Sequence, residues 1–260
     1  MKIAVTGGNG YLGKHVADYF HADALSRKTG FDVTSAKDCE RLKEYDTVIH
    51  MAALVDKTEK DPEEVFRVNA QGTFNIASVL GGGQTLVFAS TKEVRTPSDA
   101  YAYSKAVAEK YIEYFAKKNG FRSGIFRLGT TYAAPTKGKT WVNKYVEDVA
   151  NGREVILFGG GKQTRDFLHV YDLARAFQGF IDSGLQSCVL DVGGGADNSS
   201  DINGLVGLIG EVLGKKPNTK FSDSPARGQV HSITDLSEIK NTLNWSPEIS
   251  LAEGIKLISA

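Results

Sequence analysis

A glycine-rich segment near the N-terminus constrains the fold of this chain more than any other feature. Thr6–Gly13 reads TGGNGYLG and follows Lys2–Thr6, a run rich in β-branched residues that predicts a strand. Tyr11–Phe20 then carries apolar residues at helical spacing, which predicts a helix. Glycines at such a junction permit a tight turn and let the backbone approach another group closely. The pattern therefore indicates a strand, a turn and a helix in direct succession.

Short apolar runs continue to alternate with helical patterns up to Tyr132. Further strands are expected at Ala22–Ser26, Phe31–Val33, Asp46–Ala53, Thr85–Ala89 and Ser123–Leu128, and further helices over Asp61–Leu80 and Tyr101–Lys118. Strands that alternate with helices favour a parallel sheet with helices on both faces, and right-handed crossovers make such a sheet doubly wound. We therefore expect an α/β fold with a doubly wound, Rossmann-type parallel sheet.

The spacing of the glycines suits a dinucleotide. Gly7 permits the tight turn, Gly10 lets the backbone approach a pyrophosphate, and Gly13 lets the helix pack on the strand. The N-terminus of the helix adds unpaired N–H groups and a partial positive charge. Because the motif stands between a predicted strand and a predicted helix, it favours a dinucleotide site over a turn without a ligand. The residues expected at the dinucleotide are Gly7, Asn9, Gly10, Tyr11, Leu12 and Gly13.

The pattern changes after Tyr132 to loops rich in glycine and lysine. These loops are Ala134–Lys139, Gly159–Gln163 and Gly193–Asn198, and helices are expected near Trp141–Ala150, Val170–Asp182, Asp201–Leu213 and Leu236–Leu243. We expect residues 1–132, completed by segments near 164–192, to form the dinucleotide-binding domain. Residues 133–260 are expected to form mainly a smaller substrate-binding lobe.

The end of the second predicted strand bears on which dinucleotide binds. An acidic residue about 20 positions after the glycines binds the ribose hydroxyls of NAD, but this chain reads Ser26-Arg27-Lys28 there. Because arginine and lysine suit the 2′-phosphate of NADP, we favour NADP over NAD, with these three residues at the ribose. If the strand is placed differently, Asp23 or Asp32 supplies the acid, and Arg27 and Lys28 form a solvated turn.

A tyrosine and a lysine four residues apart carry the predicted chemistry. Tyr101 and Lys105 lie on one face of the expected helix, and Tyr103 faces elsewhere. A phenol loses its proton near pH ~10, and an ammonium group beside it lowers that pKa. Tyr101 can then act as general acid or base while hydride moves to or from a nicotinamide ring. Thr91, at the carboxyl end of a predicted strand, is expected to bind the same substrate oxygen.

A series of motifs runs along nearly the whole chain. They are TGGNGYLG at 6–13, HMAA at 50–53, Asn69 with Gly72-Thr73, AST at 89–91, YAYSK at 101–105, RLGTTYAAP at 127–135 and FGGGKQTRDFLHVYDLARA at 158–176. Together they resemble the extended short-chain dehydrogenase/reductase family, which includes the NAD(P)-dependent nucleotide-sugar epimerases, dehydratases and 4-ketoreductases. The resemblance implies that Thr91, Tyr101 and Lys105 are catalytic, that the substrate is a nucleotide sugar, and that two copies form a homodimer through the helix of Tyr101.

The resemblance also assigns binding residues. In that family the arginine before Asp-Phe, here Arg165, binds the nucleotide-sugar diphosphate, a task that suits a planar guanidinium group. Arg227 matches a second arginine that grips the same diphosphate, and Thr130 stands at a substrate contact. The positions that the resemblance implies at the cofactor, beyond the glycine turn, are Asp32, Val33, Met51, Ala52, Ala53, Asn69, Tyr101 and Lys105.

Three departures from the family pattern bear on the reaction. Lys92 follows Thr91 where sugar dehydratases carry an acid, which speaks against dehydration. The interval from Thr91 to Tyr101 is shorter than usual in the family, so the wall of the substrate pocket is expected to differ. Thr130 replaces an asparagine that contacts the substrate in many relatives.

The same residues leave several functions open. A 4-epimerase oxidises the sugar and reduces it again on the other face, whereas a 4-ketoreductase consumes one NADPH per turnover, and both use the same Thr-Tyr-Lys set. A non-catalytic NAD(P)-binding sensor of the same fold typically loses the Tyr-Lys pair, which this chain keeps. A ketone or aldehyde reductase outside sugar metabolism would have no use for Arg165.

Composition excludes several other classes of protein. The 31 Lys and Arg residues balance the 31 Asp and Glu residues, so the chain lacks the basic footprint of a nucleic-acid binder. No apolar run approaches the roughly 18 residues of a membrane helix, and the start, MKIAVTGG, lacks a secretory signal. Cys39 and Cys188 are too few for a disulfide scaffold, and the histidines show no metal-ligand spacing. We therefore expect a cytoplasmic enzyme without a metal.

Overall fold

The computed structural model describes residues 1–55, 58–135, 140–222, 224 and 231–259. The chain divides into two compact units. The first comprises residues 1–128 and 174–191, and the second comprises residues 129–173 and 192–260. The first unit is built on one sheet and the second on two small ones, and each unit has its own buried cluster of apolar side chains.

The first unit is built on a six-stranded sheet with the order β2-β1-β3-β4-β5-β9. Its strands are β1 (Ile3–Thr6), β2 (Asp23–Leu25), β3 (Thr47–His50), β4 (Thr85–Thr91), β5 (Arg122–Leu128) and β9 (Ser187–Val192). The pairs β1–β2, β1–β3, β3–β4 and β4–β5 are parallel. Because β2 and β3 lie on opposite sides of β1, the direction of winding reverses there. The predicted doubly wound α/β fold is confirmed.

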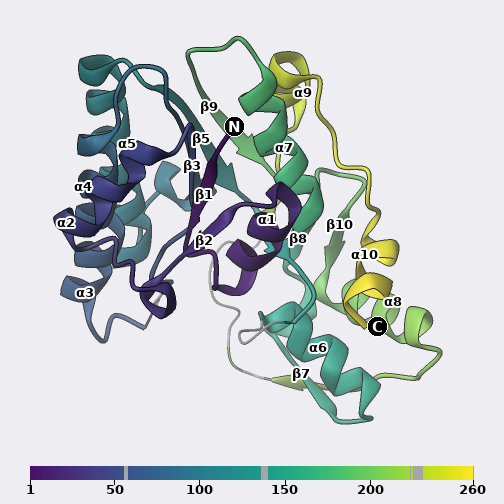
Figure 1. Ribbon diagram of the computed structural model, residues 1–260. Coiled ribbons are helices and arrows are strands. Elements are labelled where there is room, and N and C mark those ends of the chain that lie inside the picture. The colour runs from purple at the N-terminus through teal and green to yellow at the C-terminus, as the bar shows by residue number, and fades with distance from the viewer. Residues whose placement is uncertain (56–57, 136–139, 223, 225–230, 260) are drawn as a thin grey trace. The chain divides into compact units, whose positions relative to one another are not determined.

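Helices cover both faces of this sheet. They are α1 (Tyr11–Phe20), α2 (Ala36–Cys39), α3 (Pro62–Phe66), α4 (Gly72–Val79), α5 (Ala100–Asn119) and α7 (Val170–Asp182), with a π-helical turn (Arg67–Gln71) joining α3 to α4. Figure 1 shows α4 and α5 on one face and α1 and α7 on the other. The start of α5 is fixed by Asp99, whose carboxylate accepts from the N–H of Ala102 at 2.8 Å, and its end by Gly120 in the left-handed conformation.

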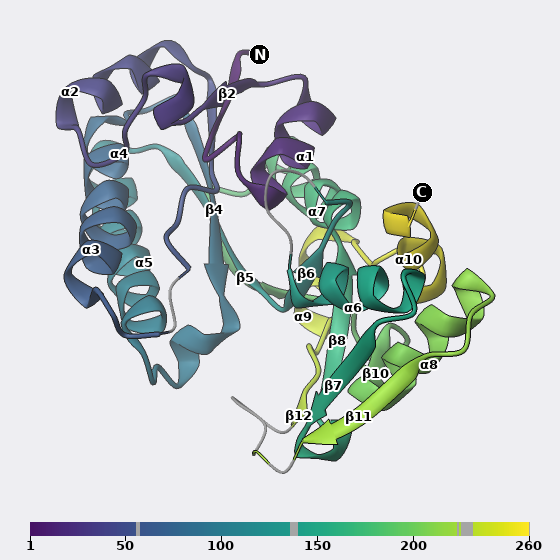
Figure 2. The ribbon, with the colours of Figure 1, turned by 90° about the horizontal axis from the view of Figure 1, so that it is seen from below.

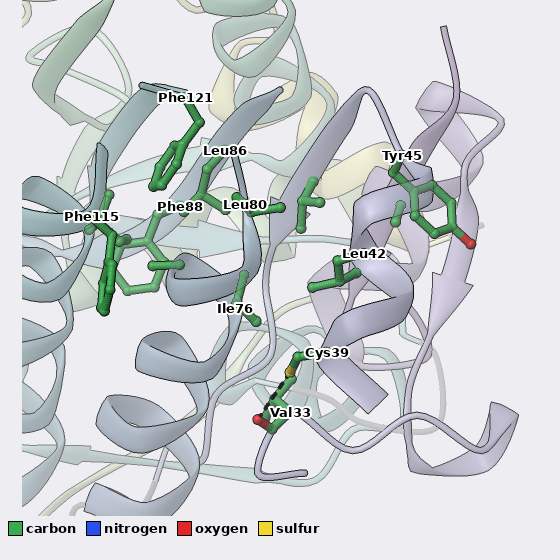
Figure 3. Packing of buried hydrophobic residues seen from close by; sticks show 14 of the residues in the cluster. Val33, Cys39, Leu42, Tyr45, Ile76, Leu80, Leu86, Phe88, Phe115 and Phe121 are labelled. Carbon is green, nitrogen blue, oxygen red and sulfur yellow. Dashed lines mark hydrogen bonds between the residues drawn. The ribbon is translucent and has the colours of Figure 1, made fainter. Parts of the chain in front are cut away.

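The buried cluster between the sheet and α4 and α5 explains most of this arrangement. Phe88 of β4, Ile76 of α4 and Phe121 before β5 are fully buried in it, and Phe115 of α5 packs beside them (Figure 3). Burying one such side chain contributes about 1.5–3 kcal/mol. On the opposite face of the sheet, α7 packs on β5 through edge-to-face contacts of Phe126 in β5 with Phe177 and Phe180 in α7.

The prediction of a strand at Phe31–Val33 is wrong. Both apolar side chains are buried in the same cluster, but the segment is a loop with a turn. Side chains satisfy its backbone instead of a neighbouring strand: the carbonyl oxygen of Val33 accepts from Asn75 at 3.0 Å and from the Cys39 thiol at 3.5 Å (Figure 3). The Asp32 carboxylate binds the N–H of Thr34, which closes the turn.

The second unit holds two small sheets and most of the remaining helices. Its strands are β6 (Thr130–Tyr132), β7 (Glu154–Phe158), β8 (Thr164–His169), β10 (Ser199–Asp201), β11 (Asn218–Ser222) and β12 (His231–Ser232), and its helices are α6 (Trp141–Ala150), α8 (Ile202–Leu213), α9 (Ser237–Leu243) and α10 (Leu251–Ser259). β6, β10 and β12 pair with β8. β7 and β11 pair in parallel and lie side by side in Figure 2. The predicted bounds of α6 and α7 are confirmed, whereas neither the strands of this unit nor α10 were foreseen.

Candidate active site

The glycine turn after β1 has the geometry of a phosphate cradle. Gly7 adopts a left-handed φ of 71°, and its carbonyl oxygen accepts from the N–H of Gly10 at 2.8 Å. A Cβ on Gly7 would lie 2.7 Å from the backbone of Ala52, which follows β3. A Cβ on Gly13 would lie 2.2 Å from the carbonyl oxygen of Gly7. The turn therefore lies directly against the end of β3, where the winding of the sheet reverses and doubly wound sheets bind their ligands.

The N-terminus of α1 is available to a negative charge. Gly10 precedes the helix without a side-chain cap, and the first turn contains no acidic residue. Its N–H groups and the positive end of the helix dipole therefore suit a pyrophosphate. The turn fits a dinucleotide site, since its close packing on the backbone of Ala52 and Gly7 leaves no room for a side chain at Gly7 or Gly13.

The residues after β2 form a small polar cluster close to this turn. The Ser26 hydroxyl donates to the Asn9 side chain at 2.6 Å and accepts from the N–H of Lys28. Arg27 is exposed and pairs with Asp32, with 3.3 Å between Nε and Oδ2. Ser26 thus lies against the glycine turn, and a guanidinium group lies next to it in the chain.

Both alternative acids have partners within the protein. Asp23 begins β2, so it lies away from the carboxyl end of that strand, and it accepts from the Tyr45 hydroxyl at 2.9 Å. The Asp32 carboxylate is engaged by Thr34 and Arg27. Burial raises the pKa of Asp32, but the hydrogen bonds from Thr34 and the charges of Arg27 and Arg67 outweigh it and lower the pKa below its ordinary value.

Asn69 holds the segment after β3 in place. Its side chain is buried in the π-helical turn, where it accepts from the N–H of Leu54 at 2.7 Å and donates to the Leu54 carbonyl at 3.0 Å. It also donates to the Ser104 hydroxyl of α5 at 3.0 Å. Asn69 therefore ties the segment that carries Met51, Ala52 and Ala53 to the helix of Tyr101. Its contacts in the structure are with Leu54 and Ser104, neither of which the sequence pointed to.

The tyrosine and lysine of α5 lie at different depths. Lys105 is 2% exposed and its Nζ lies 3.8 Å from the centre of the Phe88 ring. Tyr101 is partly buried, whereas Tyr103 is 52% exposed. The helix therefore turns Tyr101 and Lys105 inward and Tyr103 outward.

The electrostatics of this pair differ from the expectation. Burial raises the pKa of the Tyr101 phenol, and the carboxylates of Glu93 and Asp99 raise it further. Burial lowers the pKa of Lys105 to about 7, against the attraction of Glu109. In the chain by itself the pKa of Tyr101 therefore lies above its ordinary value, whereas a charged amine and a bound nicotinamide were expected to lower it. The physical reason is that a deeply buried amine loses its own proton near neutrality, while carboxylates act on the phenol.

Thr91 ends β4 and begins a short 3-10 helix, Lys92–Arg95. Its hydroxyl oxygen accepts from the N–H of Glu93 at 3.3 Å. Arg95 makes two hydrogen bonds to Asp191 of β9, at 3.2 and 3.1 Å. The connection from Thr91 to Tyr101 is thus fastened to β9, on the far side of β5, a feature that sequence reasoning missed.

The predicted substrate residues Thr130 and Arg165 belong to the second unit. Thr130 lies on β6 opposite Phe167 of β8, and Arg165 lies on β8, where its guanidinium donates to the Thr164 carbonyl at 2.8 Å. Both side chains are partly buried. Arg227 lies outside the described residues.

Two further observations concern the described part of the chain as a whole. None of its helices is both long and apolar enough to cross a membrane. Within the same residues, no three His, Cys, Asp or Glu side chains come together as a candidate metal site.

Comparison with known proteins identifies relatives along the whole chain. A putative UDP-glucose 4-epimerase of Methanocaldococcus jannaschii is 26% identical over 98% of this chain and 96% of its own length. A UDP-glucuronate 4-epimerase of Thermodesulfobacterium geofontis is also 26% identical, over 92% of this chain and 81% of its own. The alignment with the former spans 299 positions, more than the 260 residues present here, so that relative carries segments that this chain lacks.

Solved structures show the same fold. UDP-glucose 4-epimerase of Thermotoga maritima, determined with UDP-glucose, is 25% identical, with a TM-score of 0.86 over 100% of this chain and 97% of that one. RMD of Pseudomonas aeruginosa, determined with NADPH, is 21% identical, with a TM-score of 0.87 over 100% and 96%. The model of the NAD dependent epimerase/dehydratase family matches residues 3–193, well over half of the sequence. This chain therefore belongs to the NAD dependent epimerase/dehydratase family, as an NAD(P)-dependent enzyme of the extended short-chain dehydrogenase/reductase type.

Proposed function

We propose that the protein is a nucleotide-sugar 4-epimerase in which Tyr101 exchanges a proton with the sugar oxygen. The observation that carries the proposal is that one compact unit holds both the phosphate cradle at Gly7 and the inward-facing pair Tyr101 and Lys105. Relatives along the whole chain are named as UDP-sugar 4-epimerases, which supports a nucleotide sugar as the substrate.

The roles of the residues follow from their chemistry. A bound nicotinamide supplies or accepts the hydride. Tyr101, whose pKa burial raises, is a protonated phenol at neutral pH and is therefore ready to donate to a carbonyl oxygen. Thr91, at the carboxyl end of β4, provides a hydroxyl for the same oxygen. Lys105 holds its proton below about pH 7 and then favours the phenolate needed for oxidation.

A second candidate, a 4-ketoreductase, is favoured by the residues after β2. Ser26 in place of an acid, with Arg27 next to it, supports NADP as the cofactor. NADPH suits a net reduction, and the protonated Tyr101 is the acid that a reduction consumes. Lys92 replaces the acid of the dehydratases, so dehydration is not proposed.

The second unit is proposed to bind the nucleotide part of the substrate. Arg165 and Thr130 are its candidate contacts, because a guanidinium fork matches diphosphate oxygens. We also propose a homodimer through the outer faces of α3 and α5. Tyr103 and Tyr114 of α5 are 52% and 58% exposed and Phe66 of α3 is 38% exposed, so a second copy of these helices would cover apolar surface.

Product analysis tests the proposal. The purified chain is incubated with UDP-glucose or UDP-glucuronate plus NAD or NADP, and the epimers are separated by anion-exchange chromatography. Absorbance at the NADPH band follows reduction of a nucleotide 4-keto-sugar. We expect Tyr101→Phe to lose at least about a hundredfold in turnover while binding the dinucleotide as before. Tyr103→Phe, on the exposed side of the same helix, should keep full activity.

Two outcomes contradict the proposal. Equal activity of Tyr101→Phe and the parent chain would remove Tyr101 from the chemistry. Dinucleotide binding without turnover of any nucleotide sugar would instead support a non-catalytic sensor of the same fold.

A further inference from the structure

A buried carboxylate lies one helical turn beyond Lys105. Glu109 of α5 is 2% exposed, as is Lys105. Its Oε1 accepts from the Ser90 hydroxyl at 2.6 Å and from Nε of Arg127 at 3.0 Å, and its Oε2 accepts from Nη2 of Arg127 at 2.6 Å. The carboxylate is thus fixed by three hydrogen bonds from two strands.

The fold explains how these partners meet. Ser90 of β4 and Arg127 of β5 are paired across the parallel ladder, so their side chains leave the same face of the sheet. Glu109 lies four residues after Lys105, and therefore on the same face of α5. A buried carboxylate is stable only when it is paired and hydrogen-bonded, and the bidentate contact with Arg127 meets that need.

The surroundings of Lys105 can be named element by element. From α5, Glu109 acts on Lys105 by its opposite charge, and Tyr101 lies one turn before it. From β4, the Phe88 ring lies against Nζ. From β3, the imidazole of His50 is coupled to the charge of Lys105 and is fully buried. From β5, Arg127 is paired with Glu109.

We propose that Glu109 is a positioning residue that keeps the Lys105 amine in its charged form beside Tyr101, with Arg127 setting how strongly it does so. This inference rests on the proposed function, in which a charged Lys105 assists the phenol. Desolvation favours the neutral form of Lys105, and a neutral amine could not stabilise a phenolate. Glu109 offsets part of that desolvation.

The proposal predicts opposite effects from the two halves of one ion pair. Glu109→Gln keeps the size of the side chain and removes its negative charge, so Lys105 should lose its proton at lower pH. Arg127→Gln removes a positive charge that competes for Glu109, so Lys105 should keep its proton to higher pH. If Glu109 and Arg127 only support the fold, both variants should lower stability, and opposite shifts in the pH at which Lys105 loses its proton are not expected.

A titration of Lys105 measures this directly. The full chain is labelled with ¹³C at lysine Cε, and its spectra are followed against pH, with Lys105→Met assigning the resonance. We expect the midpoint to move down by at least about one pH unit in Glu109→Gln and up in Arg127→Gln. Glu113→Gln is the matched control, because it removes a glutamate one turn further along α5 that is 44% exposed. Its charge is screened by solvent, so the midpoint should stay in place.

The double variant Glu109→Gln/Arg127→Gln covers the case in which a single variant does not fold, since it removes both charges of the Glu109–Arg127 pair together. Its midpoint should lie between those of the single variants. Shifts of the two single variants in the same direction, or an unmoved midpoint in Glu109→Gln, would overturn the proposal.

Kinetics separate this inference from the proposed function. The pH profile of kcat should move with the Lys105 midpoint in the same variants. Shifted midpoints without turnover of any nucleotide sugar would leave Glu109 in its role and refute the proposed reaction. Turnover with an unmoved midpoint would refute only the role of Glu109.

Discussion

A side chain on Gly13 would bring its Cβ to 2.2 Å from the carbonyl oxygen of Gly7. The first turn of α1 and the phosphate cradle are therefore in direct backbone contact, and neither can move without the other. Backbone atoms offer no rotamer by which the contact could be relieved. A single methyl group added at Gly13 should therefore displace the backbone of the glycine turn.

Gly13→Ala should consequently weaken dinucleotide binding by at least about tenfold, because the helix must shift away from the turn that receives the pyrophosphate. It should also lower the melting temperature. Isothermal titration with NAD and NADP measures the first effect and differential scanning calorimetry the second.

Gly207→Ala supplies the matched control. Gly207 lies inside α8, and a Cβ there would meet no atom within 4 Å. Alanine favours a helix over glycine by about 1 kcal/mol, so this variant should be slightly more stable than the parent chain and bind dinucleotides equally well. Unchanged dinucleotide binding in Gly13→Ala would contradict the proposal that the glycine turn receives the pyrophosphate.

The residues after β2 predict a preference for NADP. Arg27→Ala should weaken binding of NADPH by at least about tenfold, since a charge-assisted hydrogen bond to a phosphate contributes about 1.5–3 kcal/mol. Binding of NADH, which has no 2′-phosphate, serves as the internal control and should not change. Ser26→Asp should move the preference toward NADH, because a carboxylate beside Asn9 accepts from ribose hydroxyls and repels a phosphate. Equal losses for both dinucleotides in Arg27→Ala would contradict this assignment.

Asn69 should matter for stability through the segment that it holds. Asn69→Ala removes the two hydrogen bonds that the Asn69 side chain makes to the N–H and the carbonyl oxygen of Leu54. It also removes the hydrogen bond to the Ser104 hydroxyl. An unsatisfied buried polar group costs about 1–3 kcal/mol, so the free energy of unfolding should fall by about 2–3 kcal/mol. Urea denaturation measures this loss. Ser104→Ala, which removes one of the three bonds, should lose less, and an equal loss would show that Leu54 is not the important contact.

Local sequence patterns predicted much of the secondary structure correctly. The elements that they did not predict depend on contacts between residues distant in the sequence. The glycine turn, α1 and α6 follow from short-range periodicity and were foreseen. Phe31–Val33 has the composition of a strand, but its backbone is satisfied by Asn75 and Cys39, which are distant in sequence or on another element. No local pattern could specify those partners.

The candidate site likewise contains residues that local spacing predicts and residue pairs that only the folded structure brings together. Tyr101 and Lys105 are found by their spacing on one helix. Arg95 with Asp191, and Glu109 with Arg127, join residues from separate strands and helices. Such pairs depend on which strands are neighbours in the sheet, and the order of the strands is known only once the chain has folded.

His50 provides a prediction that depends on pH. Its Nε2 lies 3.0 Å from the Thr73 hydroxyl, which itself donates to the carbonyl of Asn69, so Thr73 accepts from the ring. Its Nδ1 then accepts from Thr6 at 2.7 Å. Burial lowers the pKa of His50 well below 6.5, and the charge of Lys105 lowers it further. The folded state thus holds a neutral imidazole with both ring nitrogens engaged.

Below pH 6.5 the unfolded chain takes up a proton at His50 that the folded chain refuses. The unfolded state therefore binds more protons, so stability rises with pH and is lost as the pH falls from about 6.5 toward 5. The contribution has a slope of at most about 1.4 kcal/mol per pH unit. Urea unfolding at several pH values measures it for the parent chain and for His50→Gln, which cannot be protonated. The variant should be less stable at pH 7.5 but should lose less stability between pH 6.5 and 5, and parallel pH dependences of the two proteins would contradict the assignment of the slope to His50.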